Sequence, residues 1–266
     1  MASSPRPDPR DFRKRLLARE PLLGTFLKTP TSHHTEILGS IGFDFVMLDE
    51  EHAPWTRAAL DAGFLAARAF DAAGFVRLSR PDASSVLQVL DAGAIGIMVP
   101  HVSTVEKARN IASWARYRGG TRGSGVAVRG NGYGGRPANE VYDQADATTT
   151  VIAMIEDAEA LDQIDEITAV EGIDAFFIGR GDLRLSLSNA PGPKPTVEEA
   201  TRIVAEAALR NGKILAAVTR FPSDDAREMI ELGVTCMLAG NDHAWVRSGG
   251  LAQLKGFEQM MKGASA

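Results

Sequence analysis

The sequence predicts an α/β fold of the (β/α)8 TIM barrel type, formed by one domain spanning residues 1–266. Three observations support this prediction. The chain has 266 residues, close to the roughly 250 residues typical of such barrels. It contains eight short apolar runs without polar alternation, as expected for parallel strands covered on both faces. Segments with helical spacing lie between most of these runs, so strand and helix alternate along the chain.

The eight apolar runs are the predicted strands. They are too short for core helices, and most are rich in Val, Ile, Phe and Met. In chain order they lie at residues 23–27, 43–49, 74–79, 93–100, 151–156, 173–179, 214–218 and 235–240.

Helical spacing and capping residues define the predicted helices. They lie at residues 56–71, 84–91, 104–115, 158–169, 197–210 and 223–231. Ser103 or Thr104 and Thr196 precede early acidic residues, an arrangement that suits the positive end of a helix. Glycines that can adopt the left-handed stop conformation follow four of the helices. They are Gly93, Gly172, Gly212 and Gly233.

Three segments lie outside the strand-helix alternation. Residues 1–20 form an N-terminal extension. Residues 116–150 are too many for an idle connection in a compact domain, and we expect them to form a lid or substrate loop over the active-site face. The alternative is an excursion without a role. Residues 242–262 form a C-terminal helix, in which an apolar stripe at helical spacing runs through Trp245, Val246, Leu251, Leu254, Phe257 and Met260.

Composition excludes several functional classes. A net charge of -5 gives no general attraction to nucleic acid or acidic lipid. The single cysteine, Cys236, lies in an apolar run, which predicts a buried thiol and excludes a disulfide within the chain. No run approaches the roughly 18 apolar residues of a membrane span. The N-terminus lacks a secretory signal, so we expect a cytoplasmic protein with no membrane partner.

Two carboxylates indicate a metal site. Glu156 and Asp182 each close a short apolar run and stand 26 positions apart, about the length of one strand-helix-strand unit. Parallel strands joined by right-handed crossovers end at one edge of the sheet, where barrels carry their active sites. Two like charges there need a cation or a shared proton, and carboxylate oxygens suit Mg²⁺ or Mn²⁺. The alternative is that both acids are solvated strand ends.

A histidine and an arginine join these acids at the predicted rim. The second strand ends in Asp49, and two more acids and His52 follow it, so His52 is the candidate base near neutral pH. His101, after the fourth strand, is a weaker competitor. Arg77 places a charge inside the third strand, where it needs an anion or an acid as partner. A substrate carboxylate fits its planar fork, and a salt bridge to Asp49 is the alternative.

The chain resembles the HpcH/HpaI aldolases, the metal-dependent class II pyruvate aldolases. The resemblance extends from about Leu23 to about Trp245, and several motifs occur in the family's order and spacing. It rests on the segments GFDFVMLDEEHAPW, VRLSRPDASSVLQVLDAGAIGIMVPHVSTVEKA, VIAMIEDAEALDQIDEITAVEGIDAFFIGRGDL and ILAAV.

The resemblance implies a function. Members of this family are (β/α)8 barrels that reversibly cleave 4-hydroxy-2-oxo acids to pyruvate and an aldehyde. It implies a divalent metal cofactor (Mg²⁺, Mn²⁺ or Co²⁺), a role in the breakdown of aromatic compounds, and a homo-oligomer. That oligomer would be a hexamer, as a trimer of dimers, or a trimer, with the C-terminal helix swapped between subunits.

The resemblance also assigns roles by position. Glu156 and Asp182 match the metal ligands, and Asp49 and His52 match the ends of an Asp-x-Glu-His motif. Arg77 matches the pyruvate-binding arginine. Asp91 matches the acid that pairs with the histidine, which in the family comes from an adjacent subunit. No Schiff-base lysine is required.

Three positions depart from the family pattern. Met154 replaces the glutamine of a Gln-x-Glu motif. Arg180 replaces a proline in Gly-Pro-x-Asp, so that an extra cation could weaken metal binding or recruit a second substrate carboxylate. The glycine-rich loop at 117–125 lacks the family's prolines, although Arg122 and Gly123 remain in register to close over pyruvate. The expected substrate-binding residues are Arg77, Gly179, Arg180, Gly181, Arg122 and Gly123.

Two other functions remain open. One is a lyase of the citrate-lyase β-subunit type acting on a CoA thioester, whose phosphates could meet Arg118, Arg122, Arg129 and Arg136. The other is a barrel without catalysis, retained as a binding or assembly module. Metal-stimulated turnover separates the module from both enzymes.

Overall fold

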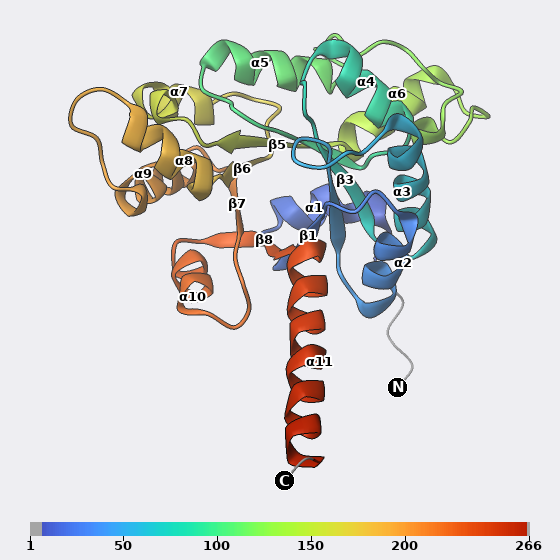
Figure 1. Ribbon diagram of the computed structural model, residues 1–266. Helices are drawn as coiled ribbons and strands as arrows, with labels where there is room; N and C mark the ends of the chain where they lie inside the picture. Colours follow the sequence, from blue (N-terminus) through green and yellow to red (C-terminus); the bar gives the residue numbers. More distant parts are fainter. Residues whose placement is uncertain (1–6, 265–266) are drawn as a thin grey trace.

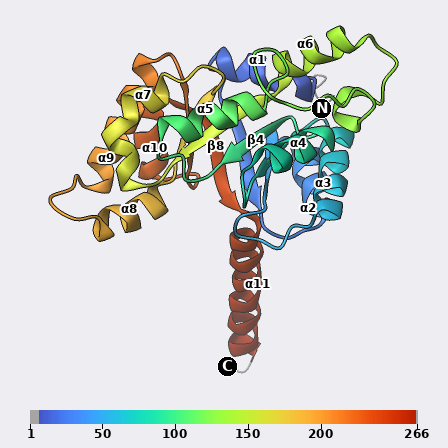
Figure 2. The ribbon, with the colours of Figure 1, turned by 90° about the horizontal axis from the view of Figure 1, so that it is seen from above.

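The computed structural model describes residues 7–264 and shows a closed barrel of eight parallel strands (Figures 1 and 2). Each strand pairs with the next, and the last pairs with the first. The predicted fold class and all eight predicted strands are confirmed. The strands are β1 (Leu22–Leu27), β2 (Phe45–Asp49), β3 (Ala73–Arg77), β4 (Gly96–Val99), β5 (Thr150–Ile155), β6 (Ala175–Ile178), β7 (Ile214–Val218) and β8 (Val234–Asn241).

The six predicted helices are also confirmed, although the region 158–169 is divided into a 3-10 helix and a short α-helix. In the described part of the chain the α-helices are α1 (Phe12–Leu17), α2 (Ser32–Ile41), α3 (Arg57–Ala69), α4 (Ala83–Asp91), α5 (Val105–Trp114), α6 (Ala138–Thr148), α7 (Ile164–Thr168), α8 (Arg180–Asn189), α9 (Val197–Arg210), α10 (Asp224–Glu231) and α11 (Asp242–Ala264). The 3-10 helices are η1 (Pro9–Asp11), η2 (Arg129–Asn131) and η3 (Ala158–Gln163).

The predicted helix boundaries follow from local chemistry. Thr104 accepts a hydrogen bond from the amide of Lys107 at the start of α5. Thr196 and Glu199 cap each other's backbone in a capping box at the start of α9. The four predicted stop glycines, Gly93, Gly172, Gly212 and Gly233, have φ values of 106°, 87°, 70° and 91°.

The barrel interior is sealed at its amino-terminal end by α1, which belongs to the predicted N-terminal extension. Phe12 and Leu16 are buried there. The ring of Phe12 packs edge-on against Phe45 and Phe75, with centroids 5.2 and 4.8 Å away. Residues 7–20 are therefore part of the folded barrel, while residues 1–6 lie outside the described residues. Cys236 lies in the same interior as a free, buried thiol, as predicted.

The segment 116–150 lies at the amino-terminal end of the strands, so the prediction that it covers the active-site face is wrong for the chain itself. Helix α5 carries the chain back from the carboxyl end of β4 before this segment begins. Arg116 Nη1 donates to Thr149 O, just before β5, at 2.9 Å. Arg129 Nη1 donates to Ala92 O, just before β4, at 3.3 Å. The segment also contains the unpredicted helix α6.

Helix α11 confirms the predicted C-terminal helix and stands away from the barrel (Figures 1 and 2). Its apolar side chains face solvent in this chain. Val246, Leu254, Phe257 and Met260 are 66%, 53%, 62% and 77% exposed. None of the helices in residues 7–264 is long and apolar enough to cross a membrane.

Candidate active site

The carboxyl ends of β2, β3, β4 and β5 bring a group of charged side chains together at one rim of the barrel. Asp49 ends β2 and Arg77 ends β3. His101 follows β4, and Glu156 follows β5 directly. Since this is the end at which barrel enzymes carry their catalytic groups, the rim is the candidate active site.

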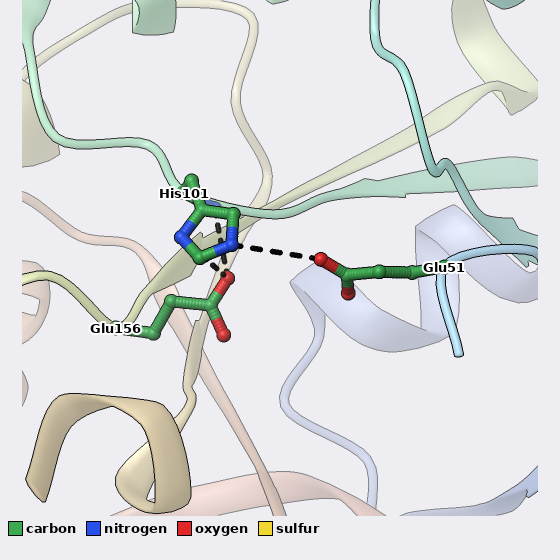
Figure 3. A group of neighbouring side chains, drawn as sticks. All are labelled: Glu51, His101 and Glu156. Carbon is green, nitrogen blue, oxygen red and sulfur yellow. Dashed lines mark hydrogen bonds and ion pairs between the residues drawn. The ribbon is translucent and has the colours of Figure 1, made fainter. Parts of the chain in front are cut away.

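Glu51, His101 and Glu156 form the centre of this site (Figure 3). One ligand atom from each lies within 4.8 Å of the others. The His101 ring has Nε2 3.6 Å from Glu51 Oε1 and Nδ1 3.7 Å from Glu156 Oε1. The backbone amide of His101 donates to Glu156 Oε1 at 2.8 Å. The three side chains come from separate βα loops, so only the closed barrel brings them together.

Glu156 is 1% exposed, and burial raises its pKa to about 7. The hydrogen bond from His101 opposes this shift, while the charges of Glu51 and Asp182 add to it. The chain after β6 approaches Glu156 closely, because a Cβ on Gly179 would lie 2.7 Å from Glu156 Oε2. Gly179 therefore shapes the wall beside Glu156, whereas Gly181 faces open space. Their prediction as substrate-binding residues stays a prediction.

The carboxylate partner of Arg77 within the chain is Asp49, the alternative considered from sequence. Arg77 Nε and Nη2 donate to Asp49 Oδ1 and Oδ2 at 2.8 and 2.7 Å. Lys28 Nζ lies 3.2 Å from Asp49 Oδ2. Burial opposes ionisation of Asp49, but the hydrogen bonds and charge of Arg77 outweigh it and lower the pKa of this carboxyl. The remaining nitrogen of Arg77, Nη1, lies 3.2 Å from Glu51 Oε2, so the arginine reaches the central cluster.

His52 and Asp182 lie at the exposed edge of the same site. The side chain of His52 is 50% exposed, and its Nε2 lies 3.8 Å from Glu51 Oε2. Its backbone amide donates to Asp49 Oδ1 at 3.3 Å. Asp182 lies in the first turn of α8 and not at the end of a strand, because this helix begins directly after the loop that follows β6. It is exposed, and its charge reaches Glu156.

Arg180 is tied to the neighbouring helix α10. Its guanidinium forms a bidentate ion pair with Asp225, in which Nη2 donates to Oδ2 at 2.9 Å, and Nη2 also donates to Val218 O at 3.1 Å. Asp225 accepts a further hydrogen bond from Thr219 at 2.7 Å. The extra cation is thus already paired within the chain, and its role in substrate binding stays a prediction.

Asp91, Arg122 and Gly123 lie at the opposite end of the barrel from Glu156. Asp91 ends α4, and Arg122 Nη2 donates to its Oδ1 at 3.1 Å. A Cβ on Gly123 would lie 3.3 Å from the side chain of Leu87, also on α4. These residues therefore do not join the site of their own chain. The prediction that Asp91 acts from an adjacent subunit, and that Arg122 and Gly123 bind substrate, stays a prediction. They could reach a site only in a neighbouring subunit.

The arginines considered for a nucleotide also lie in that distant segment. Arg118 pairs with Asp143 at 2.9 Å and Arg129 with Asp61 at 2.7 Å. Arg136 donates to Gln144. A CoA phosphate bound by them would be far from the rim of the same chain.

The carboxylate oxygens and the imidazole at the rim are suitable ligands for a divalent cation. Glu51 Oε2 is buried and, among the residues described, is near Arg77 Nη1 at 3.2 Å without accepting a hydrogen bond of good geometry. Carboxylate oxygens and imidazole nitrogens are common ligands of Mg²⁺, Mn²⁺ and Co²⁺. Ligands about 2.1 Å from one ion lie roughly 3 to 4 Å apart, and the separation of 3.6 Å between His101 Nε2 and Glu51 Oε1 is of this size. The cluster is a candidate metal site.

Sequence reasoning missed two lysines of the site and underrated one histidine. Lys28 follows β1 and Lys107 lies on α5, where its Nζ donates to Pro100 O and His101 O at 2.9 and 2.7 Å. Burial lowers the pKa of Lys107. His101 lies near Glu51, Glu156 and Asp157, whereas the ring of His52 lies near Glu51 alone among the acids described. Their positions in the sequence could have pointed to Lys28 and His101, since both directly follow predicted strands.

The fold and this site define a (β/α)8 barrel enzyme with an acidic candidate metal site at its catalytic rim, and the comparisons with known proteins agree. The model of the HpcH/HpaI aldolase/citrate lyase family matches residues 22–248. A 5-keto-4-deoxy-D-glucarate aldolase of Klebsiella pneumoniae is 31% identical over 245 residues, which cover 90% of this chain and 93% of that protein.

Solved structures give the same result. An HpcH/HpaI aldolase from Desulfitobacterium hafniense superimposes with a TM-score of 0.85 at 27% identity, covering 92% of this chain and 96% of that one. The citrate synthase SbnG gives a TM-score of 0.80 at 29% identity, covering 94% and 98%. This chain belongs to the HpcH/HpaI aldolase/citrate lyase family and is a carbon-carbon lyase. The family inferred from sequence motifs is confirmed.

Proposed function

We propose that this enzyme is a divalent-metal-dependent aldolase that reversibly cleaves a 4-hydroxy-2-oxo acid to pyruvate, or a close 2-oxo acid, and an aldehyde. The observation that carries the proposal is Glu156, a buried carboxylate among further acids, which receives neither lysine nor arginine from the chain between residues 7 and 264. Such a group suits a bound cation. We propose Glu156 and Asp182 as its ligands, with Mg²⁺, Mn²⁺ or Co²⁺ as candidate ions.

Arg77 would hold the carboxylate of the 2-oxo acid. Its Nε and Nη2 are fixed by Asp49, which leaves Nη1 directed toward the central cluster. Asp49 thus orients the guanidinium, and the low pKa of Asp49 keeps the pair charged. A carboxylate placed between Arg77 and the cation would have its negative charge met on both sides.

His52 is the proposed base. In the cleavage direction it takes the proton from the C4 hydroxyl, the bond between C3 and C4 breaks, and the electron pair of that bond passes to the pyruvate enolate. When bound, the cation supplies Lewis-acid stabilisation of the enolate oxygen. The exposed position of His52 at the mouth of the site suits contact with the aldehyde part of the substrate.

The exposed stripe of α11 supports assembly into a homo-oligomer. Its apolar side chains would be covered if the helix packed against another subunit, as the family resemblance implies. A neighbour placed over the rim could also bring Asp91 and Arg122 to the site. We therefore propose a hexamer or trimer in which these two residues act across the subunit boundary.

The name of a relative suggests which 4-hydroxy-2-oxo acids to test first as substrates. The similar Klebsiella protein is named for 5-keto-4-deoxy-D-glucarate, a dicarboxylate. We propose that this compound and other 4-hydroxy-2-oxo acids with a second carboxylate are the first substrates to compare with monocarboxylate analogues.

The deciding experiment measures pyruvate release from these acids by metal-stripped enzyme, with Mg²⁺, Mn²⁺ or Co²⁺ added back. Release should require metal, and Glu156→Gln should remove about 10³-fold or more of it. Asp165→Asn, which removes an exposed acid that pairs with Arg210, is the matched control and should retain full rate. Turnover of a CoA thioester, or metal-independent release, would contradict the proposal, and binding without turnover would favour a non-catalytic module.

A further inference from the structure

The backbone around His101 is held in a strained conformation. Its φ of 55° lies in the left-handed region, which residues other than glycine rarely adopt. The amide of His101 is fixed by Glu156, and the carbonyl oxygens of Pro100 and His101 are both fixed by Lys107. Strain of this kind persists where the surroundings over-determine it, and it is concentrated at functional sites. The fold therefore sets the position of the imidazole.

The two ring nitrogens of His101 have different partners. Nδ1 lies 3.1 and 3.2 Å from the two oxygens of Asp157. A carboxylate only accepts, so Nδ1 carries the hydrogen in this pair. Burial lowers the pKa of His101, but the charges of Glu156, Asp157 and Glu51 outweigh it and raise the pKa. Once the ring is neutral, Nε2 presents a lone pair, 3.6 Å from Glu51 Oε1, which is too far for a hydrogen bond.

Lone pairs consequently face one another across the cluster. One ring nitrogen of His101 and one oxygen each of Glu51 and Glu156 lie within 4.8 Å of each other. Nε2 faces Glu51 Oε1 at 3.6 Å, and Glu156 Oε1 lies 3.7 Å from Nδ1. Met154, two residues before Glu156 on β5, is apolar and 1% exposed, so it donates no hydrogen bond to these carboxylates. An electron-pair acceptor between these atoms would satisfy them all.

We propose that Nε2 of His101 is a ligand of the divalent cation, and that Asp157 is the positioning residue that orients the ring. This inference rests on the proposed metal-dependent function. A metal-binding histidine almost always donates its other N–H to a carboxylate, carbonyl oxygen or water, which is the arrangement of Asp157 and His101. Because imidazole nitrogen suits Mn²⁺, Co²⁺ and Zn²⁺ better than Mg²⁺, the site selects the transition metals.

The first test detects nitrogen coordination directly. Pulsed electron paramagnetic resonance of the Mn²⁺-loaded full chain should show coupling to an imidazole ¹⁴N. His101→Asn should abolish this coupling, and asparagine is chosen because it tolerates positive φ. His52→Asn, which removes the other histidine of the rim, is the matched control and should leave the coupling unchanged.

The second test measures affinity by titration calorimetry. In His101→Asn the affinity for Co²⁺ should fall about tenfold or more, whereas that for Mg²⁺ should change less than about threefold. Asp157→Asn should weaken Co²⁺ binding by about tenfold while retaining the ¹⁴N coupling. Thermal unfolding of each metal-free variant establishes that the barrel is intact.

The outcomes distinguish the inference from the proposed function. Tight Mn²⁺ binding that Glu156→Gln abolishes, but that shows no imidazole coupling, would overturn the role of His101 alone. Unchanged Co²⁺ affinity in His101→Asn would do the same and would leave His101 as a fixed cation among the acids. Absence of binding by the wild-type chain with every metal would overturn the metal-dependent function itself.

Discussion

The two ends of the barrel both bury charged groups, but they balance them differently. At the amino-terminal end, the side chain of Asp174 is 3% exposed and faces Arg13 at 2.8 Å and Arg116 at 3.2 Å. It also accepts a hydrogen bond from the amide of Val151 at 2.9 Å. At the rim, Glu156 is similarly buried, and among residues 7–264 its one ion-pair partner is His101, beside other acids. Charge left unbalanced in the fold marks the end at which the enzyme works.

Removing the balanced charge should have the largest effect on stability. Asp174→Asn leaves Arg13 and Arg116 without their carboxylate, and losing one partner of a buried ion pair costs about 3 to 5 kcal/mol. Urea unfolding should show this loss, while pyruvate release per folded molecule stays at the wild-type value. Asp165→Asn, at a pair whose side chains are 65% and 58% exposed, should cost less than about 1 kcal/mol. Equal losses in the two variants would remove the contrast between buried and exposed pairs.

Removing the unpaired carboxylate of Glu156 should instead raise the folding stability of the metal-free protein. The pKa of Glu156 is raised from 4.5 to about 7 by burial, so the folded state binds its proton more tightly than the unfolded state does. The contribution of Glu156 to folding stability is then greatest below pH 4.5 and is lost as the pH rises through about 7. Glu156→Gln should abolish that fall and stabilise the metal-free protein by about 2 kcal/mol at pH 8. Thermal unfolding across this pH range tests it, and a wild-type curve that rises between pH 5 and 8 would contradict it.

A substitution at Arg77 tests whether an arginine that is already paired with Asp49 also binds the substrate carboxylate. Arg77→Lys keeps the charge but loses the bidentate contact with Asp49. We expect a fall of about tenfold in kcat/KM, carried mainly by KM for the 2-oxo acid. Arg57→Lys, at the long contact of 3.6 Å with Glu50, is the control and should behave as wild type. A pure loss of stability with unchanged KM would assign Arg77 to structure only.

The smallest effect is expected at Arg180. The side chains of its ion pair with Asp225 are 24% and 42% exposed, so Arg180→Gln should cost about 1 kcal/mol or less. Because the guanidinium is already paired within the chain, kcat/KM should change less than about threefold. Arg180→Pro should also fold, because this residue is the first of α8, a position that favours proline. A loss of activity beyond tenfold in both variants would instead place Arg180 in contact with substrate.

The sequence was informative where a feature depends on near neighbours in the chain. The strands followed from their apolar runs. Glu156 could be placed because it directly follows a strand, and His52 because it lies three residues after one. The helices α6 and α8 were missed because each buries only two side chains, such as Leu183 and Leu187 in α8.

Features that depend on distant pairing were beyond reach. The salt bridge of Lys28 with Asp49 and the contact of His101 with Asp157 join different loops, and neither partner marks the other in the sequence. The placement of segment 116–150, by contrast, was within reach, because the predicted helix at 104–115, observed as α5, already returns the chain to the amino-terminal end of the barrel. The placement of Asp91 and Arg122 at the site of a neighbouring subunit depends on assembly and stays a prediction.

Helix α1 has a consequence for the traffic of molecules. Phe12 and Leu16 close the far end of a barrel whose interior is filled with side chains, so in the described part of the chain the proposed site opens to solvent at the rim. Both fragments of a cleaved bond must leave by the opening through which the parent molecule came. If pyruvate is held beside Glu156, as proposed, the aldehyde lies nearer the opening and would leave first.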